Sequence, residues 1–127
     1  MKKLFLLISI VIISGHIMQA QKINPKTTLR HVVMFGWDAG TDSSEVEKVV
    51  AAFRQLPGKI NLIKAFEWGI NNSPETLNQG LTHCFFLSFS TQKDRDDYLV
   101  HPAHKEFVAM KKPGLTKVTV LDYWAQQ

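Results

Sequence analysis

The feature that most constrains the fold is the order in which two hydrophobic periods follow one another along the chain. Residues 29–37 (LRHVVMFGW) alternate with a period of two, which is typical of a strand with one buried face. Residues 42–56 instead repeat at helical spacing, and strand, strand, helix and strand patterns follow in turn. This β-α-β-β-α-β order predicts an α+β, ferredoxin-like domain, in which a four-stranded antiparallel sheet carries both helices on one face.

The element boundaries follow from caps, prolines and polar stretches. The first helix should begin after Asp42, whose side chain can cap it with Glu45 three residues later, and it should end at Pro57. Its apolar stripe consists of Val46, Val49, Val50, Phe53 and Leu56. The remaining strands are expected at residues 60–70, 81–90 and 117–124.

The second helical region contains a proline that should divide it into two segments. A charged helix is expected from Ser90 or Thr91 to about Val100, with solvated acidic and basic side chains near its start. Pro102 has no backbone N–H to donate and therefore suits the first turn of a new helical segment. After such a break, the side chains point in other directions than they would on one straight helix.

The sheet should carry a second apolar face, which points away from the helices. Its residues are Val32, Met34, Cys84, Phe86, Leu121 and Tyr123. A face exposed to solvent is normally polar, and an apolar patch of this size indicates a partner. We therefore expect a homodimer in which two sheets pack face to face.

The first 20 residues have the features of a secretory signal peptide. A basic start at Lys2 and Lys3 precedes a ten-residue apolar run, and the small residue Ala20 precedes Gln21. We expect residues 1–20 to be removed and residues 21–127 to form one domain that is periplasmic or secreted, without stable membrane insertion. An uncleaved N-terminal anchor is the alternative.

The composition of the mature chain excludes some functions. Without Lys2 and Lys3 the chain has 13 basic and 11 acidic residues, a net charge of +2, which does not favour nucleic-acid binding. Cys84 is the one cysteine in the sequence, so no internal disulfide can form.

Three histidines and a tyrosine are the candidate functional groups. His31 and His83 stand on apolar strand faces that should point towards the helices, and His104 belongs to the apolar stripe of the segment after Pro102. The break before that segment can bring Tyr98 next to His104. His101, just before the proline, is expected to cap the segment or to stay solvated.

These imidazoles have three interpretations. As ligands, His31, His83 and His104 could supply three nitrogens to zinc. As acid–base groups in a partly apolar pocket, they could move protons on a carbonyl compound. As structural groups, they would only hold loops through hydrogen bonds.

Four stretches of the chain resemble the stress-responsive α/β-barrel (Dabb) domain family: HVVMF, GINNSPETLNQGLTHCFFLSF, DRDDYLVHPAHKEFV and VTVLDYW. The similarity runs from about residue 29 to residue 124. It implies a ferredoxin-like fold whose sheets pair into a dimeric α+β barrel. It does not require a metal or a cofactor.

The resemblance also implies roles for residues in a pocket between sheet and helices. One plant relative, olivetolic acid cyclase, closes a linear polyketide thioester by an aldol reaction without a cofactor. By motif position, His104 corresponds to its catalytic base and Tyr98 to the tyrosine partner. His31 and His83 correspond to two further pocket histidines.

Three phenylalanines complete the expected substrate-binding wall. Phe53 stands where the plant enzyme has a second pocket tyrosine, so that hydroxyl is absent in this chain. Phe35 and Phe85 lie on the same strand faces as His31 and His83.

Two functions follow from this pocket. In the first, an exported stress protein binds a small apolar or carbonyl-containing ligand without chemistry. In the second, a cofactor-free lyase or cyclase uses His104 to abstract a proton next to a carbonyl, with Tyr98 orienting the base and His31 or His83 steadying the oxyanion. Similar dimeric barrels that act as cofactor-free monooxygenases or bind haem provide a third interpretation, with Trp37, Trp68 and Trp124 as pocket residues.

Overall fold

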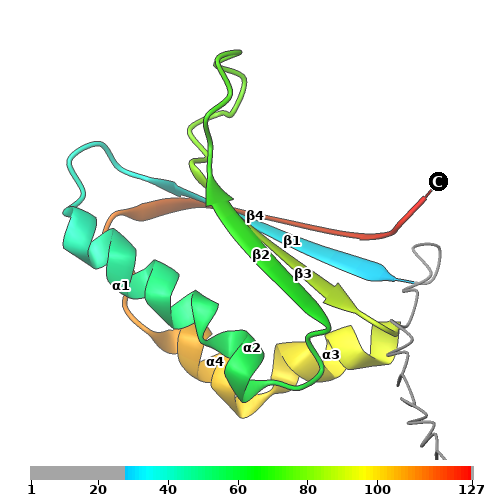
Figure 1. Cartoon of the computed structure of the whole chain (residues 1–127). Helices are drawn as coiled ribbons and strands as arrows, with labels where there is room; N and C mark the ends of the chain where they lie inside the picture. The colour runs from blue at the N-terminus through cyan, green and yellow to red at the C-terminus, as the bar shows by residue number, and fades with distance from the viewer. Residues whose placement is uncertain (1–27, 127) are drawn as a thin grey trace, which may run out of the picture.

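A computed structural model describes residues 28–126 of the chain. The elements in chain order are β1 (Leu29–Trp37), α1 (Ser43–Arg54), α2 (Leu56–Lys59), β2 (Ala65–Ile70), β3 (His83–Phe89), α3 (Gln92–Val100), α4 (Pro102–Ala109) and β4 (Leu115–Trp124). The four strands form one antiparallel sheet in the order β2-β3-β1-β4, and the helices cover one of its faces (Figure 1). The predicted ferredoxin-like α+β fold is confirmed.

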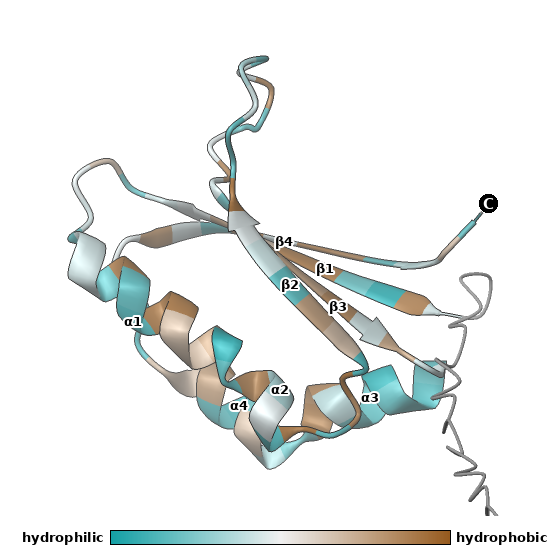
Figure 2. Cartoon of the chain, in the orientation of Figure 1, coloured by the Kyte–Doolittle hydropathy of each residue, from teal (hydrophilic) through white to brown (hydrophobic). Residues whose placement is uncertain are grey.

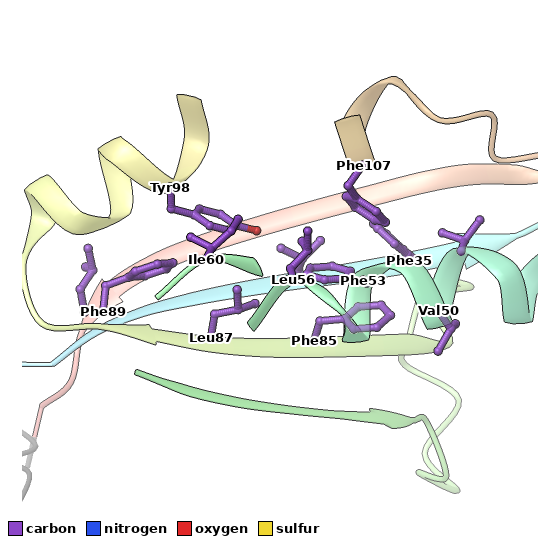
Figure 3. Close-up of a cluster of buried hydrophobic side chains, with 13 residues drawn as sticks. Phe35, Val50, Phe53, Leu56, Ile60, Phe85, Leu87, Phe89, Tyr98 and Phe107 are labelled. Carbon is purple, nitrogen blue, oxygen red and sulfur yellow. The ribbon is translucent and has the colours of Figure 1, made fainter. Parts of the chain in front are cut away.

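The core fills the space between the sheet and the helices. Alternate residues of β1 and β3 point inward, and their ladder pairs Val33 with Phe85 and His31 with Leu87. On the helix side, Phe53 stacks on Phe85 with the ring centroids 4.1 Å apart. Figure 3 shows Phe85 and Leu87 of β3 in one cluster with Phe53 from the helix side.

The expected boundaries agree with the structure to within two residues, except between α1 and β2. Pro57 does not stop the helical path, because it occupies the first turn of the short helix α2, where a proline loses no hydrogen bond. Ile60, expected in the second strand, caps α2 instead and is fully buried in the core. The strand therefore starts only at Ala65.

The break between α3 and α4 lies where Pro102 predicted it. His101 leaves the helical region with φ −61° and ψ 138°, and Pro102 starts α4. The His101 Nδ1 accepts a hydrogen bond from the Ala103 N–H, so His101 caps α4. In Figure 2 the exposed turns of α3 are hydrophilic, which fits the solvated face expected from their charges.

No helix of residues 28–126 covers the opposite face of the sheet (Figure 1). Leu121 is 55% exposed and Tyr123 is 47% exposed, while Cys84 on the same face is also exposed. The guanidinium of Arg30 lies over the Phe86 ring on this face, 5.1 Å from its centroid. The apolar face predicted from the sequence is therefore present.

Among residues 28–126, none of the helices has the length and apolar character needed to cross a membrane. The signal peptide expected at residues 1–20 lies outside the described residues.

Candidate functional site

A cavity of about 410 Å³ lies between the inner sheet face and the helices α3 and α4. Apolar side chains form most of its wall: Val33, Phe35, Phe53, Leu99, Phe107, Val108, Leu115, Val118 and Val120. Five polar groups complete it: His31, Tyr98, His104, Lys112 and Asp122. A mostly apolar cavity with a few convergent polar groups is the usual form of a small-molecule site.

Tyr98 and His104 meet in this cavity. Their ring centroids are 4.4 Å apart, across the break at His101 that separates α3 from α4. Figure 3 shows the Tyr98 ring entering the core from α3 with its hydroxyl pointing to the side on which Phe107 lies. The predicted proximity of Tyr98 and His104 is confirmed.

The Tyr98 hydroxyl is a neutral hydrogen-bond donor that faces the cavity. The side chain is only 1% exposed, and burial, followed by the charge of Asp122, raises its pKa well above the usual range. The hydroxyl forms no hydrogen bond with residues 28–126. Every fully buried polar side-chain atom in this range has a hydrogen-bond partner, so the hydroxyl is not fully buried. The hydroxyl is therefore accessible from the cavity.

His104 is held with one nitrogen available. Its Nδ1 lies 3.0 Å from the Leu99 carbonyl oxygen, which can only accept, so Nδ1 carries the proton and donates. The Nε2 of the neutral ring is then a free base. Burial lowers the pKa of His104, against the opposing effect of the Leu99 hydrogen bond, which keeps the ring neutral at neutral pH.

His31 is buried beside this pair and belongs to a network that joins three elements. Its ring is 4% exposed and packs edge-on against Tyr98, with the ring centroids 5.6 Å apart. Its Nδ1 lies 2.5 Å from Oδ1 of Asp122 in β4. The other oxygen of Asp122 accepts a hydrogen bond from Arg95 in α3.

Asp122, Arg95 and Lys112 were not predicted as site residues. A sequence signal existed for Asp122, since it continues the inward-facing series Val118 and Val120 of an otherwise apolar strand. Arg95 lay within the charged run that was assigned to solvent. Its side chain is nevertheless only 15% exposed, because it reaches across to Asp122.

Lys112 has a structural role at the end of the cavity. Its Nζ donates to the carbonyl oxygens of Phe107, Val108 and Met110 at distances of 2.7 to 3.1 Å, so its three N–H groups are all used. Burial lowers the pKa of this amine. Lys112 thus caps the last turn of α4 and fixes the wall that carries Phe107.

His83 does not belong to the cavity, so the expectation that it would meet the other histidines is wrong. The antiparallel register pairs His83 with Phe35, whereas His31 pairs with Leu87, four residues further along β3. His83 instead accepts a hydrogen bond from the Trp37 indole N–H at 3.2 Å. Burial lowers its pKa.

The three predicted phenylalanines divide in the same way. Phe35 and Phe53 line the cavity, whereas Phe85 is fully buried behind them and does not. None of the three tryptophans considered for a haem or monooxygenase pocket lines the cavity. With His83 elsewhere, the proposed three-histidine metal site does not form, and residues 28–126 contain no other group of three ligands that could hold an ion.

The fold and the cavity together define a ferredoxin-like α+β domain with an internal small-molecule site. The model of the stress-responsive A/B barrel domain (Dabb) matches residues 29–125. The stress-response A/B barrel domain-containing protein HS1 of Arabidopsis thaliana is 35% identical over 98 residues, which are 77% of this chain and 90% of that protein. The chain belongs to the Dabb family.

An enzyme is among the curated relatives. Olivetolic acid cyclase of Cannabis sativa is 22% identical over 95 residues, which are 75% of this chain and 94% of the cyclase. This level of identity does not carry the activity from one protein to the other.

Solved structures show the same fold. The crystal structure of the Arabidopsis thaliana protein At3g17210 has a TM-score of 0.71 at 33% identity and covers 78% of this chain and 96% of its own. A hydroxynitrile lyase from Passiflora edulis has a TM-score of 0.73 at 23% identity, with 81% and 97% covered. A protein of Thermobifida fusca, described as dimeric and ferredoxin-like, has a TM-score of 0.65 at 22% identity, with 76% and 90% covered.

Proposed function

We propose that the cavity binds a small, largely apolar molecule that carries a carbonyl group. The observation that carries this proposal is the Tyr98 hydroxyl, a neutral donor with no hydrogen-bond partner among residues 28–126, in a mostly apolar wall. A carbonyl oxygen would accept from this hydroxyl, and the apolar body would lie against Phe35, Phe53 and Phe107. The cavity of about 410 Å³ is in the ordinary size range for such ligands.

Acetophenone is a suitable probe, because it combines an aromatic ring with one carbonyl. We expect Tyr98→Phe to bind acetophenone about fivefold more weakly than the unchanged protein, since one hydrogen bond of about 1 kcal/mol is lost. Binding is measured by NMR titration. Tyr123→Phe is the matched control, because Tyr123 lies on the opposite face of the sheet.

Equal affinity of the Tyr98→Phe and unchanged proteins for acetophenone would contradict the proposed binding mode. Absence of saturable binding to the unchanged protein would contradict binding of this ligand class.

Proton transfer is the second candidate function, and the His104 geometry favours it. The hydrogen bond to Leu99 leaves Nε2 unprotonated in the wall that also contains Tyr98. In the reaction, the C–H bond next to the carbonyl breaks, its proton goes to Nε2, and the enolate oxygen accepts a hydrogen bond from Tyr98. Two proteins of this fold have enzyme names, olivetolic acid cyclase and hydroxynitrile lyase, which supports this candidate.

The methyl protons of acetophenone test this step separately from binding. An active base exchanges them for deuterium in D₂O, and we expect His104→Gln to slow the exchange at least a hundredfold while acetophenone still binds. His83→Gln is the matched control, because this histidine lies outside the cavity. Equal exchange rates in the unchanged protein and His104→Gln would leave binding as the function.

We further propose that the chain works as a homodimer through its outer sheet face. The exposed apolar residues on that face and the dimeric description of related folds support this proposal. Leu121→Asp should give a monomer by light scattering. Val100→Asp, at an exposed apolar residue at the end of α3, should leave the dimer intact. A Leu121→Asp protein that stays dimeric would contradict this interface.

Export is proposed from the basic start and apolar run of residues 1–20. The mature protein, purified from its source cells, should begin at Gln21. An intact Met1 on protein from those cells would contradict cleavage.

A further inference from the structure

The His31–Asp122–Arg95 network is not used in the proposed binding of a carbonyl. It joins β1, β4 and α3 at the edge of the cavity. Buried polar networks of this kind fix the orientation and the protonation of the groups they contain.

The contact with Asp122 determines which nitrogen of His31 carries a proton. A carboxylate oxygen can only accept, and Oδ1 lies 2.5 Å from Nδ1, so Nδ1 is the protonated nitrogen. The other nitrogen, Nε2, has no hydrogen bond to any residue of 28–126. Every fully buried polar side-chain atom in this range has a hydrogen-bond partner, so Nε2 is not fully buried. It is accessible from the cavity that His31 lines.

Arg95 holds the carboxylate that orients His31. The Arg95 guanidinium binds the second oxygen of Asp122 and so connects it to α3, while the first oxygen stays on Nδ1 of His31. The ring also packs edge-on against Tyr98, which limits its rotation.

We propose that Asp122 and Arg95 are positioning residues that hold the His31 ring with its proton on Nδ1, so that Nε2 accepts a hydrogen bond from a ligand hydroxyl. The inference deepens the proposed function, on which it rests, because it adds a hydroxyl to the ligand class. It also changes the role expected for His31, since a lone pair cannot donate to an oxyanion. His31 recognises a proton donor in the cavity wall that also contains Tyr98.

The tautomer of His31 is measured directly by the ¹⁵N shifts of its two ring nitrogens at pH 7.5. In the unchanged protein, Nδ1 should be protonated and Nε2 bare. In Asp122→Asn, the side-chain amide can donate to Nδ1, so the proton should move to Nε2, as it does when the acid of a His–Asp pair is replaced by its amide. Asp122→Glu should restore the original tautomer.

The role of Arg95 is tested on the same signals. Arg95→Gln should loosen the hold on Asp122, so the Nδ1 and Nε2 shifts of His31 should move towards the average of the two tautomers. Lys93→Gln on the same helix is the control, because Lys93 pairs with Asp97 and does not reach Asp122. Thermal melting of each variant identifies any that fail to fold.

Phenol and anisole test the ligand class, because they differ in the hydroxyl proton. The ratio of their dissociation constants, anisole over phenol, should be roughly tenfold smaller for Asp122→Asn than for the unchanged protein. A ratio that does not change when the tautomer switches would overturn the hydroxyl recognition. Nitrogen shifts that are the same in Asp122→Asn and the unchanged protein would overturn the positioning role, and this result does not depend on whether any ligand binds.

Discussion

Two histidines on the inner face of the same sheet have opposite hydrogen-bonding arrangements. At one end, His31 donates from Nδ1 to Asp122 and faces the cavity with Nε2. At the other end, the Nδ1 of His83 accepts from the Trp37 indole, which can only donate, so a neutral His83 carries its proton on Nε2. The first arrangement leaves an acceptor for a ligand, whereas the second ties the ring to the fold.

The difference shows that the surroundings, and not the strand position, determine what a buried histidine can do. Between His83 and the helices the inner face carries stacked rings, including Phe53 on Phe85 and Phe85 against Trp68. His83 borders a separate hollow beside the loop after β2, whereas His31 lines the cavity between the sheet and the helices α3 and α4. We call the part of the inner face around Phe85 the aromatic end and the part around His31 the cavity end. We expect the aromatic end to determine stability and the cavity end to determine binding.

The largest expected effect on stability is that of Phe85→Ala at the aromatic end. Phe85 is fully buried and does not line the cavity. Its removal leaves a void among packed rings, and we expect a loss of about 3–5 kcal/mol in the free energy of unfolding. Urea denaturation measures this loss, with Tyr98→Phe as the comparison at the cavity end.

We expect Tyr98→Phe to change the free energy of unfolding by less than about 1 kcal/mol, because its hydroxyl has no protein partner to lose. Similar losses in Phe85→Ala and Tyr98→Phe would mean that the two ends do not divide stability and binding.

A smaller effect is expected from Arg95→Ala. Arg95 connects α3 to Asp122 in β4, and a hydrogen bond between charged groups contributes about 1.5–3 kcal/mol. Urea denaturation should therefore show a loss in this range. Lys93→Ala, two residues away on the solvent side of α3, should show no measurable loss. Equal behaviour of the two variants would contradict the assignment of Arg95 to the site.

The smallest effect is a dependence of stability on pH that both ends share. Burial lowers the pKa of both His83 and His104, so the unfolded chain takes up these protons at a higher pH than the folded chain. Stability should therefore fall as the pH drops below about 6.5, the usual value for histidine. The double variant His83→Gln/His104→Gln should lose less stability between pH 7.5 and pH 5.5.

Urea midpoints at the two pH values measure this difference. The single variants should each remove part of the slope, because the two histidines lie far enough apart to act independently. A slope that steepens in the double variant would contradict the direction of both pKa changes.

Most of the fold could be predicted because hydrophobic periods and caps are local signals. The four strands, the helix capped by Asp42 and the break at Pro102 all follow from residues close in sequence. The error at Pro57 and Ile60 has a physical reason. A proline is compatible with the first turn of a new helix as well as with the end of an old one, and only the packing of Ile60 into the core decides between them.

The site was less predictable because it depends on strand register. Tyr98 and His104 lie six residues apart, so the broken helix brings them together by local geometry. His83 was grouped with His31 by strand face alone, and the register of β1 and β3 separates them. Asp122 reaches His31 across 91 residues of sequence, a pairing that no local pattern specifies.

Titration of ¹⁵N-histidine-labelled protein with acetophenone is the most direct test of the cavity as a binding site. The ring signals of His31 and His104 should shift with saturation, and the signals of His83 should stay unchanged. Shifts confined to His83, or no shift in any of the three up to the solubility of acetophenone, would contradict binding in the cavity.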